Sequence, residues 1–192
     1  MKIWLITDTH FGHDKMPLYC GRPEDFSEII LENLKVVRDG DLLIHLGDIC
    51  IGRDEYWHKR LMGQGSYMRW LVRGNHDGKS NTWYMNHGWD FVCSKFQDRY
   101  FGKNIMFSHV PVHYTEVVET LYGMGSFDLN IHGHFHNTLH RLQEGKFVTD
   151  TEEERNIVDL KNITDRHKLL AVEHTDYKPV LLEAFINSPE TL

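Results

Sequence analysis

The sequence predicts an α/β fold, and two observations support this class. Apolar runs rich in β-branched and aromatic residues, typical of buried strands, alternate with segments whose apolar residues recur at helical spacing. One apolar run after another then ends in Asp, His or Asn. Because ligands of open α/β sheets bind beyond the carboxyl ends of the strands, we expect these polar side chains to converge at one edge of the sheet.

The composition is that of a globular domain, with 41% hydrophobic and 26% charged residues. We expect one domain over residues 1–192, because no linker, repeat or low-complexity segment interrupts the chain. The net charge of −7, without a dense Lys or Arg run, argues against a general nucleic-acid-binding surface. Three dispersed cysteines predict reduced thiols, and no apolar run approaches the ~18 residues of a membrane span. We therefore expect a cytoplasmic protein without a signal peptide or membrane contact.

The first half of the chain is expected to alternate strands with helices. Residues 3–7 read as an apolar strand that ends in the polar sequence DTHFGH. Residues 23–40 predict a helix, since their apolar residues recur at helical spacing between a proline and a glycine. A second strand is expected at 42–48 and a helix at 54–62. A third strand then runs from residue 67 into the polar turn RGNHD.

The second half of the chain is expected to contain mostly strands. The sequence SNTWYMNHG, residues 80–88, suggests a short helix, and TDTEEER, residues 149–155, suggests an exposed loop. Strands are expected at residues 91–96, 100–109, 129–132, 168–174 and 179–185.

Five short motifs follow the expected strands in order: DTH, HLGD, RGNHD, SH and HGHFH. Together they resemble the signature blocks of calcineurin-like metallophosphoesterases: Asp-x-His, Gly-Asp, Gly-Asn-His-Asp/Glu, His and Gly-His-x-His. Each block alone is weak, whereas all five in order, each after an apolar strand, are specific. They cover about the first 136 residues, and residues 168–185 resemble the closing strands of small bacterial and phage members. The resemblance implies a mixed β-sheet sandwich flanked by helices, in four α/β/β/α layers.

The same resemblance implies a centre of two divalent metal ions. The implied ligands are Asp8, His10 and His136 for one ion, Asn75, His109 and His134 for the other, and Asp48 as the bridge. A carboxylate can bridge because it has two oxygens with spare lone pairs. Mixed imidazole and carboxylate shells suit Mn, which we expect first, and also Fe, Ni, Zn or Co. Two such ions lower the pKa of a bridging water, which then attacks phosphorus.

Two further kinds of site residue are expected around the metals. His76 is implied as the general acid that hydrogen-bonds the phosphate and protonates the leaving oxygen, beside the catalytic Asp48 and Asn75. Asn75, as a neutral ligand, adds no negative charge where a phosphate arrives. His13 and Arg22 are candidates for contacting the substrate, although Arg22 before a proline could equally lie at the start of a helix.

Other residues near the motifs have a structural alternative. His132 precedes Gly133 and is expected to pack rather than to ligate, since a glycine there suggests a turn or a close backbone approach. His45 is expected in the core or hydrogen-bonded behind a ligand. The aromatic residues of the segment before the last motif could form a rim over the substrate or simply pack: Tyr114, Tyr122 and Phe127.

The expected function is hydrolysis of phosphodiester bonds. The element Asp-Arg-Gly of serine/threonine protein phosphatases does not follow Asp48, and the chain is short, so the resemblance favours small phosphodiesterases. Their substrates include small phosphodiesters, cyclic nucleotides and nucleic-acid ends. A phosphomonoesterase or nucleotidase on the same metals, a non-catalytic scaffold of the same fold and a structural metal protein remain alternatives. The oligomeric state stays open.

Overall fold

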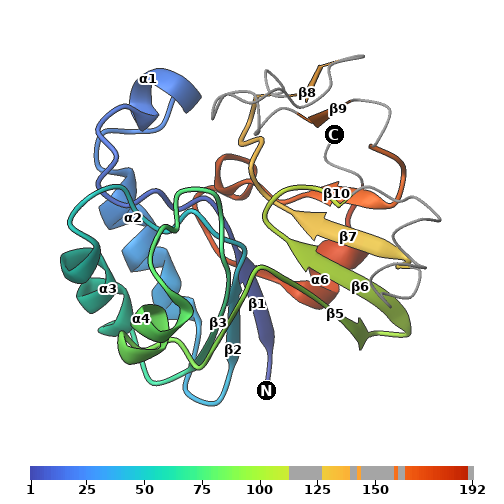
Figure 1. Cartoon of the computed structure of the whole chain (residues 1–192), viewed down its shortest axis with the longest axis horizontal. Helices are drawn as coiled ribbons and strands as arrows, with labels where there is room; N and C mark the ends of the chain where they lie inside the picture. The colour runs from blue at the N-terminus through green and yellow to red at the C-terminus, as the bar shows by residue number, and fades with distance from the viewer. Residues whose placement is uncertain (113–126, 139–141, 144–157, 160–162, 190–192) are drawn as a thin grey trace.

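Two β-sheets packed against each other form the frame of the protein (Figure 1). The computed structural model describes residues 1–112, 127–138, 142–143, 158–159 and 163–189. The first sheet has the order β11-β1-β2-β3-β4. Its strands are β1 (Ile3–Ile6), β2 (Leu42–His45), β3 (Met68–Val72), β4 (Phe91–Cys93) and β11 (Val180–Leu181). β1 to β4 run parallel, and β11 pairs antiparallel with β1.

The second sheet has the order β10-β7-β6-β5. Its strands are β5 (Lys95–Tyr100), β6 (Lys103–Ser108), β7 (Leu129–His132) and β10 (His167–Leu169). β10, β7 and β6 are parallel, whereas β5 and β6 form an antiparallel hairpin. β8 (Leu142–Gln143) and β9 (Val158–Asp159) pair separately. The carboxyl ends of β1, β2, β3, β6 and β7 therefore belong to two different sheets.

Helices cover one face of the first sheet (Figure 1). They are α1 (Met16–Cys20), α2 (Phe26–Asn33), the 3₁₀ helix η1 (Leu34–Val36), α3 (Asp54–Met62) and α4 (Asn81–Asn86). Alternate strand residues face these helices, as Trp4 and Ile6 do, whereas Leu5 faces the other sheet. A parallel strand covered on both faces needs a continuous apolar run, which explains the sequence of β1 and β2.

A second core fills the space between the sheets. It joins Leu5 and Ile44 of the first sheet to Phe107 and Ile131 of the second. The last helix, α6 (Leu182–Asn187), adds Leu182, Phe185 and Ile186 to this core. The mixed sheets with flanking helices confirm the expected α/β class. Among the described residues no helix is long and apolar enough to cross a membrane.

Two expected strands in the middle of the chain differ in the structure. Residues 91–96 form parts of two strands, since β4 ends at Cys93 in the first sheet and β5 begins at Lys95 in the second. Residues 100–109 contain a hairpin turn at Phe101 and Gly102, whose φ angles of 50° and 80° suit a tight type I′ connection. Tyr100 therefore ends β5 instead of starting β6.

The C-terminal segments are also more helical than expected. Only residues 180–181 of the expected strand 179–185 are extended, and α6 follows. Leu182, Phe185 and Ile186 are spaced for one helical face, a pattern that a short apolar run conceals. In the expected strand 168–174, β10 ends at Leu169 and a 3₁₀ helix, η4 (Val172–Thr175), follows.

The expected helix at 23–40 is shorter, with α2 and η1 spanning residues 26–36. α1 was not expected from the sequence. The expected loop 149–155 lies outside the described residues.

Candidate metal centre

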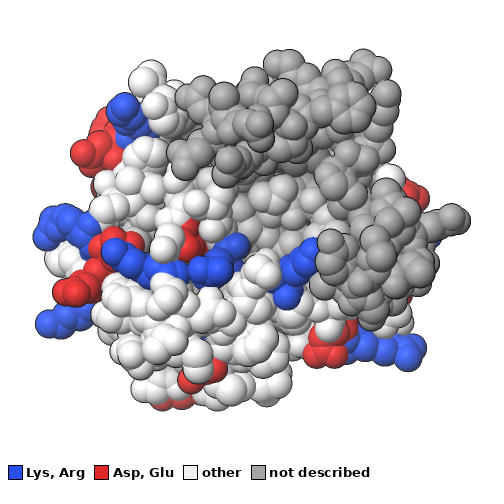
Figure 2. Space-filling model, in the orientation of Figure 1, with Lys and Arg blue, Asp and Glu red and all other residues white. Residues whose placement is uncertain are grey.

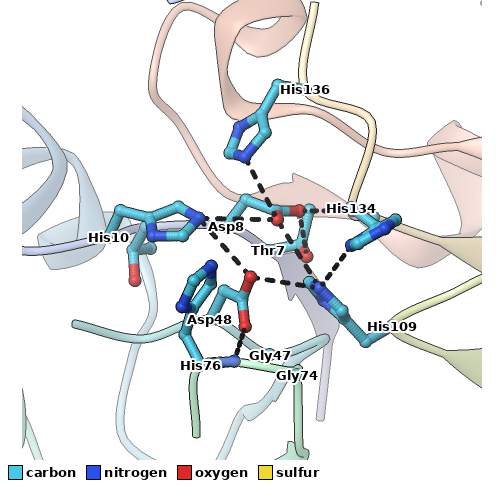
Figure 3. A network of polar contacts seen from close by, with 12 residues as sticks. Thr7, Asp8, His10, Gly47, Asp48, Gly74, His76, His109, His134 and His136 are labelled. Atoms are coloured by element: carbon cyan, nitrogen blue, oxygen red, sulfur yellow. Dashed lines mark hydrogen bonds and ion pairs between the residues drawn. The ribbon is translucent and has the colours of Figure 1, made fainter. Parts of the chain in front are cut away.

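Seven side chains from five strand ends meet at one point. Figure 3 shows the Asp and His side chains among them. Asp8 and His10 follow β1, Asp48 follows β2, and Asn75 follows β3. The remaining three follow strands of the second sheet: His109 after β6, and His134 and His136 after β7. The structure thus brings together all seven residues that the sequence motifs indicate as ligands, with both sheets contributing.

One group of donor atoms surrounds the Asp8 carboxylate. Asp8 Oδ1 lies 3.9 Å from His10 Nε2 and 3.7 Å from His136 Nε2. Two ligands of one ion, bound at ~2.1 Å each, lie about 3–3.5 Å apart in a tetrahedral or octahedral shell. The observed separations are slightly wider, so a small inward movement of these side chains would close the shell. Asp8, His10 and His136 can therefore hold one metal ion.

A second group surrounds the His109 imidazole. His109 Nε2 lies 3.1 Å from Asn75 Oδ1, 3.3 Å from His134 Nδ1 and 3.2 Å from Asp48 Oδ2. Asp48 Oδ2 also lies 3.5 Å from His10 Nε2, so this oxygen borders both groups. Asp8 Oδ1 is 4.0 Å from His109 Nε2, which makes Asp8 a more distant partner for the second group. Asp48 therefore lies between the two groups of side chains.

The chemistry of these atoms fits cations. Asp8 Oδ1, Asp48 Oδ2 and both ring nitrogens of His10 are buried, and none has a hydrogen-bond partner among the described residues. Buried polar atoms without partners are costly, and two carboxylate oxygens that face one centre repel each other. Divalent ions would satisfy these atoms and remove the repulsion.

The opposite oxygen of each carboxylate is fixed by hydrogen bonds. Asp8 Oδ2 accepts from the Thr7 hydroxyl at 2.7 Å and from the His134 backbone N–H at 3.0 Å. Asp48 Oδ1 accepts from the His76 backbone N–H at 2.8 Å. One oxygen of each carboxylate is thereby held by the protein, and the other is directed into the centre (Figure 3).

The backbone is left-handed at most of these ligands. Positive φ angles between 45° and 75° occur at Asp8, His10, Asp48, His134 and His136. Asp and His tolerate this region better than most residues, but it still costs free energy and is concentrated at functional sites. At each of these residues the left-handed backbone turns the chain at the end of its strand. The side chain is thereby directed toward the centre, whereas a continued extended strand would direct it elsewhere.

Two glycines allow the strand ends to approach so closely. A Cβ on Gly133 would lie 2.2 Å from Asp8 Oδ2, and a Cβ on Gly74 would lie 2.1 Å from Asp48 Oδ1. Both distances are far below van der Waals contact. The close backbone approach expected at Gly133 is therefore confirmed.

The buried carboxylates act on the neighbouring imidazoles. Burial opposes the charged form of His136, yet Asp8 and other neighbours raise its pKa to about 10. Burial acts in the same way on His109, where Asp48 and Asp8 raise the pKa to about 9. At His10 burial prevails and lowers the pKa well below its usual value. The centre thus attracts positive charge, whether protons or metal ions.

A buried ion pair lies behind His136. Glu173 Oε1 is 3.2 Å from His136 Nδ1 and accepts from Arg22 Nε at 2.8 Å and Arg22 Nη2 at 2.6 Å. Arg22 Nη2 also lies 3.3 Å from His136 Nδ1, but two donors cannot bond each other, so we assign the Nδ1 proton to Glu173. This arrangement leaves His136 Nε2 free to ligate. Sequence motifs give no signal for Glu173, because it lies 151 residues from Arg22.

The expected substrate contact by Arg22 is wrong. Its side chain is fully buried, and it also donates to the backbone oxygens of Thr9 and Asp8 at 3.0 and 2.8 Å. Arg22 therefore supports the first motif from within the protein. His13 is half-buried instead, and its ring centroid lies 5.7 Å from that of His10. A substrate contact by His13 stays a prediction.

His76 lies at the rim of the centre. Its ring centroid is 5.4 Å from that of His10, and the residue is exposed, as is Asn75. His132 is fully buried, contacts the Gly133 oxygen through Nδ1 at 3.0 Å and lies outside both groups. Burial lowers its pKa to about 3, which keeps the imidazole neutral.

Two buried residues stabilise the loop that carries Asp48. His45 Nδ1 accepts from the Gly47 N–H at 3.0 Å, and its Nε2 lies 2.9 Å from Thr9 Oγ1. Asp77 accepts from the backbone N–H groups of Asp48, Ile49 and Gly74 at 2.7 to 3.1 Å. Asp77 closes the motif RGNHD but received no role from the sequence. Phe127 is buried, which favours the packing alternative, and Tyr114 and Tyr122 lie outside the described residues.

Comparisons with known proteins agree with this geometry. The family model described as calcineurin-like phosphoesterase matches residues 1–182. An uncharacterised protein of Methanocaldococcus jannaschii is 28% identical over 193 residues, which cover 96% of this chain and 89% of that protein. The crystal structure of a protein of unknown function from Aquifex aeolicus superposes with a TM-score of 0.64 at 24% identity, covering 95% of this chain and 96% of the other. With the family model spanning nearly the whole chain, the protein belongs to the calcineurin-like phosphoesterase family.

Proposed function

We propose that this protein is a binuclear metal-dependent phosphodiesterase. In the reaction, water adds to phosphorus, one P–O ester bond breaks, and a phosphomonoester and an alcohol leave. The observation that carries the proposal is the position of Asp48 Oδ2, buried without a hydrogen-bond partner among the described residues, 3.5 Å from His10 Nε2 and 3.2 Å from His109 Nε2. A carboxylate oxygen shared by two imidazole groups suits two ions in one centre.

The ligand set defines which residues would hold the ions. Asp8, His10 and His136 would hold one, Asn75, His109 and His134 the other, with Asp48 between them. When bound, the ions would polarise the phosphoryl oxygens and lower the pKa of a coordinated water. We expect Mn first, with Fe, Ni, Zn or Co as alternatives, because the set has imidazole, carboxylate and amide donors but no thiolate.

His76 supplies the proton in this proposal. Its backbone N–H is bonded to Asp48 Oδ1, which holds the imidazole at the rim beside the first group of ligands. From there a protonated ring nitrogen can reach the leaving oxygen of a phosphate on the centre. His13, beside His10, lies on the same side and is proposed to contact the substrate. The neutral Asn75 amide faces the phosphate without repelling it.

Space beside the centre supports a diester over a monoester. A cavity of about 560 Å³ begins at Asn75 and His109, so a second substituent on phosphorus has room. Small phosphodiesters, cyclic nucleotides and nucleic-acid ends are the proposed substrates. A general nucleic-acid-binding surface is not proposed, because the chain carries a net charge of −7.

The proposal is tested by stripping the protein of metal, restoring Mn²⁺, and assaying bis-p-nitrophenyl phosphate against p-nitrophenyl phosphate. We expect Mn²⁺-dependent hydrolysis of the diester and a lower kcat/KM for the monoester. Asp48→Asn should abolish turnover of both. A preference for the monoester would favour a nucleotidase or other phosphomonoesterase. No hydrolysis of either with Mn²⁺, Ni²⁺ or Co²⁺ would favour a non-catalytic scaffold.

A further inference from the structure

The cavity beside the second group of ligands lies where the chain crosses between the two sheets. β4 ends at Cys93, Ser94 crosses, and β5 begins at Lys95 in the second sheet. Lys95 pairs in register with Ser108, the residue before His109. The Arg73 N–H donates to the Cys93 oxygen at 2.9 Å, two residues before Asn75. The sheet crossing therefore places one cationic residue beside each of two expected metal ligands.

The lining of this cavity is positive, although the protein is acidic. Arg73 and Lys95 are its charged residues, and no Asp or Glu appears among the described residues that line it. In the described part of the chain, neither has a carboxylate within ion-pair distance. Unpaired cations in a cleft attract anions strongly. On the face drawn in Figure 2, basic side chains lie in a row across the middle, with acidic side chains beside part of the row.

The Arg73 guanidinium also has an N–H donor that no described residue accepts. Its Nη1 donates to the Lys79 backbone oxygen at 3.0 Å, which fixes the side chain in place. Its Nε is buried and has no partner among the described residues. A buried donor without a partner calls for a ligand, and a guanidinium suits phosphate oxygens. Val110 and Pro111 also line the cavity and give it apolar surface.

The cavity and His76 lie on different sides of the centre. Figure 3 shows His76 and His109 flanking Asp48 from opposite directions. The cavity is lined by Asn75 and His109, whereas the ring of the proposed proton donor, His76, lies beside that of His10. A group in the cavity is therefore the part of the substrate that stays on phosphorus, away from the leaving oxygen.

We propose that this cavity binds the retained nucleoside of a phosphodiester substrate and that Arg73 and Lys95 recognise a second phosphate on that nucleoside. The preferred substrate is then a nucleotide diester with a further phosphate one sugar away, as in a nucleic-acid end. The apolar surface suits the sugar and base, and the two cations suit the added phosphate. The part of this inference that treats the bound nucleotide as a substrate rests on the proposed function.

Binding of two nucleotides tests the cavity independently of turnover. Isothermal titration calorimetry compares thymidine 5′-monophosphate with thymidine 3′,5′-bisphosphate on the Mn²⁺-restored protein. We expect the bisphosphate to bind about tenfold more tightly, as one charge-assisted hydrogen bond allows. Lys95→Gln and Arg73→Gln should each reduce this preference severalfold, and added salt should weaken it. Lys103→Gln, which removes an exposed lysine of the same hairpin, is the matched control and should retain the preference.

Two outcomes would overturn the inference. The first is equal affinity of the wild-type protein for both nucleotides. The second is an unchanged preference for the bisphosphate in both Lys95→Gln and Arg73→Gln, provided that both variants unfold at the wild-type temperature. Hydrolysis then extends the test, with the 5′-p-nitrophenyl ester of thymidine monophosphate compared with its 3′-phosphorylated form. We expect a higher kcat/KM for the 3′-phosphorylated ester, through a lower KM. A binding preference without any hydrolysis would support the cavity and contradict the proposed function, so the two failures are distinguishable.

Discussion

Glu173→Gln should weaken binding at one metal position and leave the other unchanged. Glu173 is ionised at neutral pH: burial opposes its charge, but His136 and Arg22 lower its pKa to about 2. The substitution therefore removes a real negative charge from the acceptor of the His136 Nδ1 proton. The glutamine oxygen can still accept from Arg22, so the geometry is largely retained while the imidazole becomes a weaker donor to a cation.

The magnitude follows from the contacts that change. Loss of a partner behind a metal-bound histidine typically lowers metal affinity about 10- to 100-fold, or about 1.4–2.7 kcal/mol. Since the substituted amide side chain keeps the Arg22 contacts that the glutamate makes at 2.6 and 2.8 Å, we expect the lower half of this range. The Arg22 charge also loses its counter-ion in a buried position, which should lower the free energy of unfolding by ~1–3 kcal/mol.

Calorimetric titration of metal-stripped protein with Mn²⁺ measures this effect without turnover. We expect two binding events in the wild-type protein and a selective weakening of one in Glu173→Gln. Glu28→Gln is the matched control, because Glu28 also forms an ion pair with an arginine, Arg60, but at the surface. It should change neither metal affinity nor, beyond ~0.5 kcal/mol, stability. Wild-type affinity at both positions in Glu173→Gln would refute the reasoning.

Four further substitutions or reactions test other parts of the structure. His76→Ala should retain both metals and lose turnover by ~10²–10⁴-fold, and an equal loss of metal content and activity would contradict its role as acid. Gly133→Ala should lower the free energy of unfolding by ~3 kcal/mol, because its Cβ would meet Asp8 Oδ2 at 2.2 Å; an unchanged urea midpoint would count against this. Asp77→Ala should destabilise by ~3 kcal/mol or more, since it leaves three backbone N–H groups without their acceptor, as urea unfolding would measure. Burial raises the pKa of the Cys93 thiol to about 11, so iodoacetamide at pH 8 should modify it ~100-fold more slowly than a free cysteine, and mass spectrometry showing similar rates would disprove this.

The strands that carry ligands were predictable because each is an apolar run ending in a motif. β1 and β2 are buried along nearly their whole length, and apart from His45 at the end of β2 their sequences are continuously apolar. The left-handed turns after them place Asp8 and Asp48 as the motifs imply. The order of the five motifs was therefore enough to indicate the seven ligands, although not the distances between them.

The parts that were missed depend on contacts between distant segments. Glu173 lies in a 3₁₀ turn that resembles the end of a strand in sequence, and only the fold brings it to Arg22 and His136. Arg22 was expected near the substrate because it follows the first motif. Its burial depends on a partner 151 residues away, which no local pattern contains. The crossing at Ser94 was missed because only this one residue separates β4 from β5, so the sequence reads as a single extended run.

The left-handed backbone at five ligands lowers the folding stability of the protein in return for the placement of metal-binding side chains. These residues are Asp8, His10, Asp48, His134 and His136. Each such residue costs about 1 kcal/mol relative to a right-handed conformation, so the five together cost about 5 kcal/mol. That sum is comparable with the whole folding stability of a small domain, about 5–15 kcal/mol. Selection for heat resistance alone, in the laboratory or in nature, would therefore tend to replace these five positions with glycine and erase the centre while improving the fold.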